Sequence, residues 1–151
     1  MSAEERPRSV ARRPASFAVR EMEDGDVDEV VAVWNAAGVS RPWNDPARDL
    51  AFARLHPHST VLVGVTERIV ATVMVGEDGH RGWVYYLAVD PERRREGFGR
   101  AMMAAAEGWL SQRGVWKLQL LIREENVAVQ RFYEALGYRD VRTVCMQKVI
   151  G

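Results

Sequence analysis

The sequence predicts an α/β domain in which a central sheet is flanked by about four helices. Its 151 residues, 47% of them hydrophobic, are enough for one sizeable core. Short β-branched or aromatic runs alternate with longer segments whose apolar residues recur at helical spacing, in the order βααβββαβαββ. Residues 1–15 hold four arginines, two prolines and almost nothing large and apolar. We therefore expect a disordered tail over 1–15 and a single domain over 16–151.

The first half of the chain contains four expected strands and two expected helices. Val27, Val30, Val31 and Trp34 fall at core spacing in a helix that Gly38 ends. The second helix begins at Pro46, with Asn44 or Asp45 as its cap. In order, the expected elements are a strand at 16–20, a helix at 26–37, the Pro46 helix, a hairpin of strands 60–66 and 69–75, and a strand at 83–89.

The second half predicts two more helices and three more strands. These are a helix at about 99–113, a strand at 117–122, a helix at 127–136 and two closing strands at 138–140 and 144–149. Cys145 is the only cysteine, which excludes an internal disulfide and metal clusters built on thiolates. Because it lies in an alternating strand pattern, we expect it to be a buried small hydrophobe.

Residues 90–100 read as a phosphate-binding loop between a strand and a helix. Pro91 cannot continue a strand ladder, so the chain turns there. Gly97 and Gly99 let the backbone approach a ligand where the next helix begins. The first N–H groups of a helix lack partners and lie at its positive end, which favours an anion. The arginines at 93–95 add positive charge around the same point.

Three kinds of glycine-rich, phosphate-binding loop could account for this segment. The alternative is a plain tight turn that starts a helix. A Walker loop ends in Gly-Lys-Ser/Thr, whereas this chain has Gly99-Arg100-Ala101. A dinucleotide fingerprint needs a small residue where Met102 stands, and an acidic residue further on that is missing here. The remaining pattern, Arg-x-x-Gly-x-Gly from Arg94 to Gly99, resembles the acyl-CoA loop of the GNAT superfamily of N-acyltransferases.

A second motif carries the same resemblance. From Asn126 the chain reads Asn-Val-Ala-Val-Gln-Arg-Phe-Tyr-Glu-Ala-Leu-Gly-Tyr, which is similar to the fourth-helix signature of that superfamily. Asn126 is a good N-cap, and Gly137 can take the left-handed position after the helix. The resemblance covers about residues 16–150 and implies a three-layer fold with a mixed, mostly antiparallel sheet. Within the superfamily, the chain resembles a small group of uncharacterised bacterial members.

The resemblance also implies an acetyl-CoA site. The strand backbone at Leu87, Ala88 and Val89 would pair with the pantetheine arm, and Asn126 would steady that arm from the other side. The pyrophosphate would lie on Arg94, Arg95, Glu96, Gly97, Phe98, Gly99 and Arg100. Tyr133 matches the general acid that protonates the departing thiolate; the alternative is a packing aromatic beside Phe132.

The base and the acceptor site are less well defined. The stretches 83–89 and 117–122 contain no carboxylate, so the hypothesis is a water relay acting on an amine of modest pKa. We expect Arg41, Trp43, Asn44 and Tyr85 to line the acceptor site. Alternatively, 41–46 is a capping turn with Trp43 in the core. The segment 76–82 is either a polar hairpin turn or a second wall carrying Asp78 and His80.

These features predict an acetyl-CoA-dependent N-acetyltransferase, cytoplasmic and without a metal, that acts on a primary amine of a small molecule or of a peptide or protein N-terminus. One alternative is an acyl-CoA-binding module without catalysis. Another is nucleic-acid binding through the arginine tail, but the net charge of zero disfavours nucleic-acid and membrane partners. By resemblance to many relatives, Trp116 and the closing strands would support a homodimer.

Overall fold

The computed structural model describes residues 16–151, so the expected tail over 1–15 lies outside the described residues. The chain divides into two compact units, Met1–Leu120 and Leu121–Gly151. The first unit contains the sheet and the phosphate-loop motif, and the second contains the Asn126 motif. No helix in the described part of the chain is long and apolar enough to cross a membrane.

The first unit is built on a five-stranded sheet with the strands in sequence order. The strands are β1 (Ala18–Glu21), β2 (Ser59–Val65), β3 (Ile69–Glu77), β4 (Gly82–Val89) and β5 (Leu118–Gln119). β1 to β4 pair antiparallel, and β5 pairs parallel to β4. The mixed, mostly antiparallel sheet is therefore confirmed, although β5 is shorter than the predicted 117–122.

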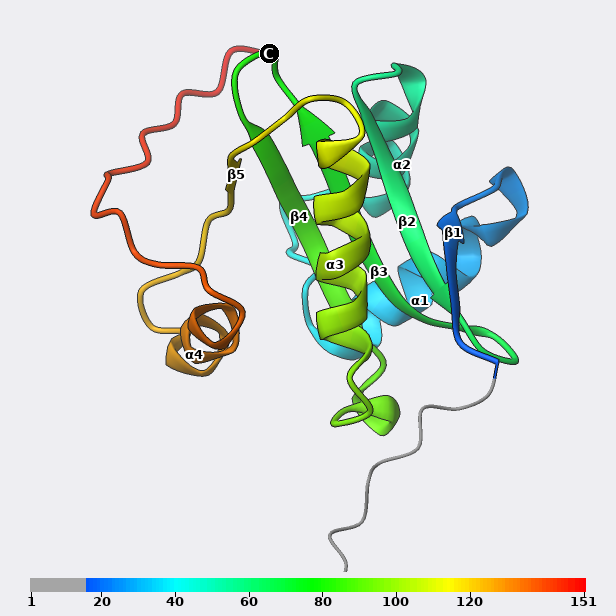
Figure 1. Ribbon diagram of the computed structural model, residues 1–151. Helices are drawn as coiled ribbons and strands as arrows, with labels where there is room; N and C mark the ends of the chain where they lie inside the picture. The colour runs from blue at the N-terminus through cyan, green and yellow to red at the C-terminus, as the bar shows by residue number, and fades with distance from the viewer. Residues whose placement is uncertain (1–15) are drawn as a thin grey trace, which may run out of the picture. The chain divides into compact units, whose positions relative to one another are not determined.

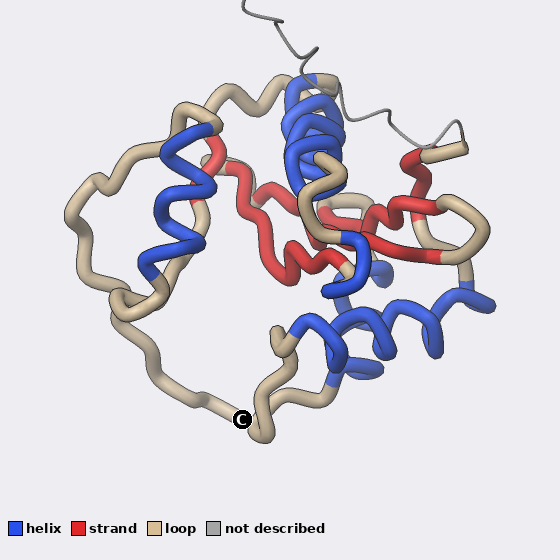
Figure 2. Tube along the Cα trace, turned by 90° about the horizontal axis from the view of Figure 1, so that it is seen from below, coloured by secondary structure: helices blue, strands red, loops and turns tan. Residues whose placement is uncertain are grey.

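Helices cover both faces of this sheet. They are α1 (Val27–Ala37), which follows the short helix η1 (Asp24–Asp26), then α2 (Pro46–Leu55) and α3 (Phe98–Ser111), which follows η2 (Pro91–Arg93). α1 and α2 lie on one face and α3 on the other (Figure 1). Seen along the strands, the sheet is the middle of three layers (Figure 2). This burial on both faces is why β2 and β3 are apolar along most of their length.

Local signals set the helix boundaries. Gly38 takes the left-handed conformation, at φ 71°, and its N–H bonds to the carbonyls of the last turn, so α1 ends there. Asp45 rather than Asn44 caps α2, because its carboxylate accepts from the N–H of Arg48 at 3.2 Å. Pro46 is the first residue of that helix, as the sequence predicts.

An irregularity in β4 changes the direction of its side chains. Met74 pairs with Tyr85, but Thr72 pairs with Ala88, so Val73 alone faces both Tyr86 and Leu87. This is a β-bulge, and Tyr86 has the positive φ of 52°. A bulge disrupts the strict alternation of faces, so two consecutive side chains can lie on the same face.

The second unit contains one helix, α4 (Val127–Ala135). Asn126 caps it, accepting from the N–H of Val129 at 3.4 Å, and Gly137 follows it with a φ of 94°. The expected closing strands at 138–140 and 144–149 are wrong, since no residue after Gln119 in the described chain forms a strand. Without sheet pairing, the alternating pattern buries nothing: Val144, Met146, Val149 and Ile150 are exposed. Cys145 is also exposed, which corrects its expected burial.

Candidate active site

The expected phosphate loop has the geometry of an anion site. Gly97 adopts φ 82°, and α3 begins at the next residue. The first backbone bond into the helix runs from the N–H of Ala101 to the carbonyl of Gly97, at 3.1 Å. The N–H groups of Phe98, Gly99 and Arg100 therefore precede the helical ladder and point out of its positive end. An anion placed there would receive hydrogen bonds from the backbone itself.

Ion pairs fix the loop to the β2–β3 turn. The carboxylate of Asp90 contacts Arg68 at 2.6 Å and accepts from the N–H of Glu92 at 2.9 Å. Arg93 contacts Glu67 at 2.9 Å and Glu96 at 2.8 Å. The backbone hydrogen bond from Glu92, followed by Arg68, lowers the pKa of Asp90 below its ordinary value of 3.8. The Arg93 side chain therefore stabilises the loop itself.

Three other arginines leave their charge available for a ligand. Arg94, Arg95 and Arg100 are exposed, and none forms an ion pair with a described residue. Arg95 also has a positive φ, at 67°. A non-glycine residue in this conformation is uncommon and often marks a functional turn. The loop therefore presents positive side chains next to unpaired backbone N–H groups.

The end of β4 leaves one backbone edge open. β5 pairs with β4 only at Gly82 and Trp83. Ala88 and Val89 pair with β3 on the other side, so among the described strands nothing adjoins this end of β4 on its β5 side. Such an edge can pair with the amides of an extended ligand. The expected positions Leu87, Ala88 and Val89 therefore lie at an open edge that leads directly to the phosphate loop.

A network of polar groups lies on the α1–α2 face of β4. The Tyr86 hydroxyl donates to the Asp49 carboxylate at 2.6 Å and accepts from the Asn44 amide at 3.3 Å. The Tyr86 ring stacks on Trp34, with centroids 3.8 Å apart. Burial first, and then the hydrogen bond to Asp49, raises the pKa of Tyr86 to about 12. Its phenol is therefore protonated at any physiological pH.

The loop between α1 and α2 tests one part of the capping interpretation of 41–46, the burial of Trp43. Trp43 is 70% exposed, so the alternative that buries it in the core is wrong. Arg41 donates to the carbonyl of Gly38 at 3.0 Å, which ties it to the end of α1. Asn44 reaches Tyr86, and Tyr85 is exposed on the neighbouring strand. The structure thus brings Asn44 to the β4 bulge and uses Arg41 locally.

The segment 76–82 is a hairpin turn. The carboxylate of Asp78 accepts from the N–H groups of His80 and Arg81 and from the indole of Trp83, at 2.7–3.1 Å. Glu77 contacts His58 at 2.7 Å. These bonds lie within the turn or beside it, and they explain its polar residues without a ligand.

In the second unit, Tyr133 is only 7% exposed. Its ring packs edge-on against Phe132 and Tyr138, with centroids 5.1 Å and 5.5 Å away. Burial raises the pKa of Tyr133 to about 12. The side chain is therefore a neutral phenol, which can donate a proton but cannot act as a base near neutral pH. Asn126 lies in the same unit as Tyr133, and its side chain caps α4.

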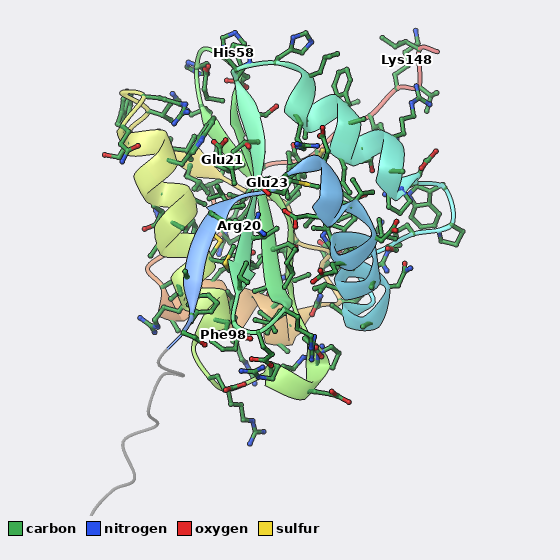
Figure 3. All side chains as sticks on the ribbon, turned by 90° about the vertical axis from the view of Figure 1, so that its right-hand side faces the viewer. Arg20, Glu21, Glu23, His58, Phe98 and Lys148 are labelled. Carbon is green, nitrogen blue, oxygen red and sulfur yellow. The ribbon has the colours of Figure 1, made fainter. Side chains whose placement is uncertain are left out.

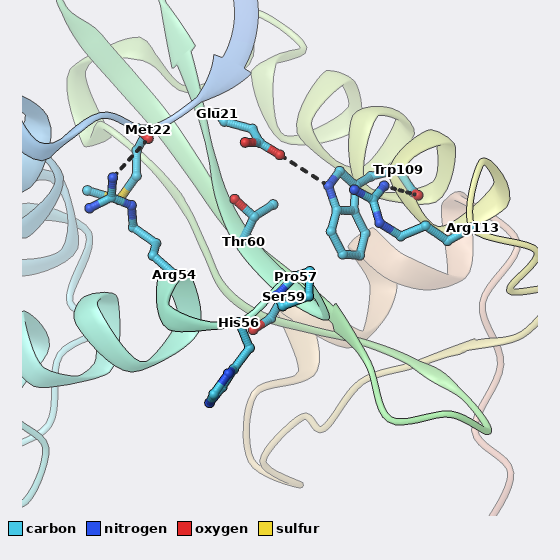
Figure 4. A pocket seen from close by; sticks show the side chains of 9 residues that line it. All are labelled: Glu21, Met22, Arg54, His56, Pro57, Ser59, Thr60, Trp109 and Arg113. Atoms are coloured by element: carbon cyan, nitrogen blue, oxygen red, sulfur yellow. Dashed lines mark hydrogen bonds between the residues drawn. The ribbon is translucent and has the colours of Figure 1, made fainter.

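A cavity of about 330 Å³ lies elsewhere in the first unit. Glu21, Thr60, Trp109 and Arg113 are among its lining residues (Figure 4), and the Trp109 indole donates to Glu21 at 3.4 Å. It lies where α3 ends, whereas the phosphate loop lies where α3 begins. Figure 3 shows the same separation, with Phe98 and His58 at opposite ends of the sheet. None of the predicted site residues lines this cavity.

Sequence reasoning missed two residues on the α1–α2 face of β4, Asp49 and Tyr86. Asp49 looks like an ordinary polar residue in the first turns of a helix, and Tyr86 like one more aromatic in a buried strand. The Tyr-Tyr pair was the available signal, because strict alternation would expose one of two adjacent tyrosines and bury the other. The bulge that brings both to one face had no glycine to mark it.

Comparison with known proteins identifies acetyltransferases as the similar proteins. The model of the acetyltransferase (GNAT) family matches residues 20–138. An acetyltransferase of Yersinia enterocolitica is 40% identical over 131 residues, 86% of this chain and 93% of that protein. A protein of Yersinia pestis described as an uncharacterized N-acetyltransferase matches to the same extent.

Solved structures share the fold at low sequence identity. AAC(6')-Iy, solved with the bisubstrate analog CoA-S-monomethyl-acetylneamine, has a TM-score of 0.78 at 14% identity, covering 91% of this chain and 100% of its own. Glucosamine-6-phosphate N-acetyltransferase from Arabidopsis thaliana has a TM-score of 0.70 at 18% identity, covering 90% and 99%.

Proposed function

Because the chain belongs to the acetyltransferase (GNAT) family, it is an acyl-CoA-dependent acetyltransferase, and we propose that it acetylates a primary amine directly from acetyl-CoA. The amine belongs to a small molecule or to the N-terminus of a peptide or protein. The observation that carries the cofactor assignment is the start of α3, where Gly97 at φ 82° precedes three N–H groups outside the helical ladder. A pyrophosphate fits this position by charge and by hydrogen bonding.

The adjoining backbone would bind the rest of the cofactor. The open edge of β4 at Leu87–Val89 is the proposed seat of the pantetheine amides, and Arg94, Arg95 and Arg100 supply charge for the phosphates. Each contact at a helix terminus contributes about 0.3–2 kcal/mol. Micromolar affinity, about 8 kcal/mol, therefore needs the loop, the β4 edge and the arginines together.

In the proposed reaction, the amine nitrogen attacks the thioester carbonyl, the C–S bond breaks, and the leaving sulfur gains a proton. We assign that proton to Tyr133. With its pKa near 12 and a thiol near 8.5, complete transfer in isolation is uphill by about 5 kcal/mol. Transfer in step with C–S cleavage avoids much of this cost, because negative charge is then developing on the sulfur.

The amine must lose its own proton before or during attack. β4 and β5 carry no carboxylate, so we propose that water relays this proton to solvent. Deprotonating a lysine amine at pH 7 costs about 4–5 kcal/mol, against about 1 kcal/mol for an α-amine with a pKa near 8. The proposed acceptor amine therefore has a modest pKa in its bound state.

Calorimetric titration with acetyl-CoA tests the cofactor site, on wild type, Gly97→Glu and Gly79→Glu. The two glycines are a matched pair, because each has φ 82° and no atom within 4 Å of an added Cβ. Gly79 lies in the 76–82 turn, away from the loop. We expect binding by wild type and Gly79→Glu, and none by Gly97→Glu. Equal binding by all three proteins would overturn the assignment of the loop. A folded wild type that binds no acetyl-CoA would refute the proposed function.

A further inference from the structure

The β4 bulge creates a surface that regular alternation would not. Tyr85 pairs with Met74, which packs against the core cluster under α1, so Tyr85 faces the α1–α2 layer. Tyr86 faces the same layer, because its ring stacks on Trp34 of α1. Trp83, two residues before Tyr85, stacks with it at a centroid distance of 6.5 Å. Three aromatic side chains of β4 therefore follow one another on one face.

A carboxylate is held at the end of this aromatic row. Asp49 Oδ2 accepts the Tyr86 hydroxyl at 2.6 Å, and no other described residue bonds to the carboxylate. The Tyr86 hydroxyl is itself fixed from two sides, by Asp49 and by Asn44. Asp49 is half-buried, so Oδ1 can still receive a ligand.

A second carboxylate near Asp49 adds to the negative charge that would attract a cation. Asp49 lies in the first turn of α2. Asp45 lies four residues earlier, so the two carboxylates stand on the same side of the helix. The Asp45 carboxylate accepts from the N–H of Arg48, whereas Asp49 forms no ion pair with another described residue. Electron-rich rings beside a carboxylate are suited to an ammonium group.

We propose that Asp49 binds a second cationic group of the acceptor, so that the enzyme prefers diamines and polyamines to amines with a single charge. This inference rests on the proposed function, in which Leu87 to Val89 hold the arm that carries the acetyl group. Tyr86 is bonded directly to Leu87, so the carboxylate lies one tyrosine side chain away from that backbone. A diamine of a few carbons spans this interval, with one nitrogen at the thioester and the other at Asp49.

A pair of acceptors of equal length tests the proposal. 1,5-Diaminopentane and n-hexylamine have the same number of heavy atoms, and one ammonium replaces one methyl group. We expect wild type to favour the diamine by about tenfold or more in kcat/KM, the size of one charge-assisted hydrogen bond. Asp49→Asn should lower this ratio to about one. Asp28→Asn, an exposed acid on α1, is the control and should keep the wild-type ratio.

Calorimetric binding of each amine to the enzyme loaded with CoA gives a second measurement that needs no turnover. Tighter binding of the diamine, lost in Asp49→Asn and kept in Asp28→Asn, supports the proposal. Equal binding of the two amines by wild type, or a preference that survives in Asp49→Asn, overturns it. These results are separate from failure of the proposed function itself, which appears as a wild type that does not bind acetyl-CoA.

Discussion

The indole of Trp34 lies face to face with the ring of Tyr86, with centroids 3.8 Å apart and planes within 6° of parallel. The Trp34 N–H donates to the Thr72 hydroxyl at 2.9 Å, and that hydroxyl donates to the carbonyl of Tyr86 at 3.0 Å. Helix α1 and strand β3 thus hold the bulged residue by its ring and by its backbone. The positive φ of Tyr86 is maintained by these contacts.

Replacing Thr72 by valine should destabilise the protein by about 2–4 kcal/mol, because two buried polar groups lose their partner at once. Thr60→Val is the matched control. Thr60 is also a buried strand threonine, but its hydroxyl makes no hydrogen bond to another described residue. Urea unfolding of the three proteins gives the comparison. Equal loss of stability in both variants would show that the Thr72 bridge contributes nothing specific.

Replacing Tyr133 by phenylalanine should lower kcat by about 10²–10⁴-fold, the usual range for loss of a general acid. Acetyl-CoA affinity should stay within a few fold, because the ring that packs on Phe132 and Tyr138 is retained. Steady-state kinetics and calorimetry on the same preparation measure the two effects. Phe132→Leu serves as a packing control on the same helix. Normal turnover by Tyr133→Phe would exclude the acid role.

Alkaline pH should weaken the fold through Tyr133. Burial raises its folded pKa from 10.0 to about 12, so the stabilisation is complete below pH 10 and is lost as pH rises to about 12. A shift of this size corresponds to at most about 2–3 kcal/mol. Unfolding free energies measured across this interval should fall more steeply for wild type than for Tyr133→Phe. Parallel curves would mean that the phenol is not held in a desolvated site.

Replacing Asp90 by asparagine should destabilise the phosphate loop. The variant loses the ion pair with Arg68 and weakens the bond from the N–H of Glu92, a cost of about 1–2 kcal/mol. The pKa of Asp90 is lowered in the folded protein, so its stabilisation is present above about 3.8 and lost as pH falls below that value. The difference in unfolding free energy between wild type and variant should therefore be largest near neutral pH and shrink as pH falls below 3.8. A difference that stays constant over this range would contradict the ionic origin of the effect.

Most elements could be predicted because their signals are local. Gly38 ends α1, Asp45 caps α2, and Gly97 marks the start of α3, each through the conformation of a single residue or turn. The loop of 90–100 was placed correctly for the same reason. These signals act over three or four residues, so one sequence is sufficient to detect them.

The features that could not be predicted depend on distant partners. The Asn44–Tyr86 bond joins residues 42 positions apart, and the Trp34–Thr72 bond joins residues 38 apart. One of the two interpretations of 41–46 put Trp43 in the core, yet it is exposed. The alternation at 144–149 is suited to a strand, but a strand exists only where its backbone pairs with a neighbour. The sequence pattern shows that a segment can form a strand, and backbone pairing with a neighbour decides whether it does.

The ion pairs of Asp90 with Arg68 and of Arg93 with Glu67 join the phosphate loop to the β2–β3 turn at both ends of η2. The conformational entropy of the loop is therefore lost during folding and not again when a ligand arrives. The hydrogen-bonded amides of Glu92 and Arg93 should exchange slowly with deuterium in the ligand-free protein and slow only slightly further on binding. Affinity would then respond to changes in the turn, which carries none of the proposed ligand-binding groups, and not only to changes in the loop.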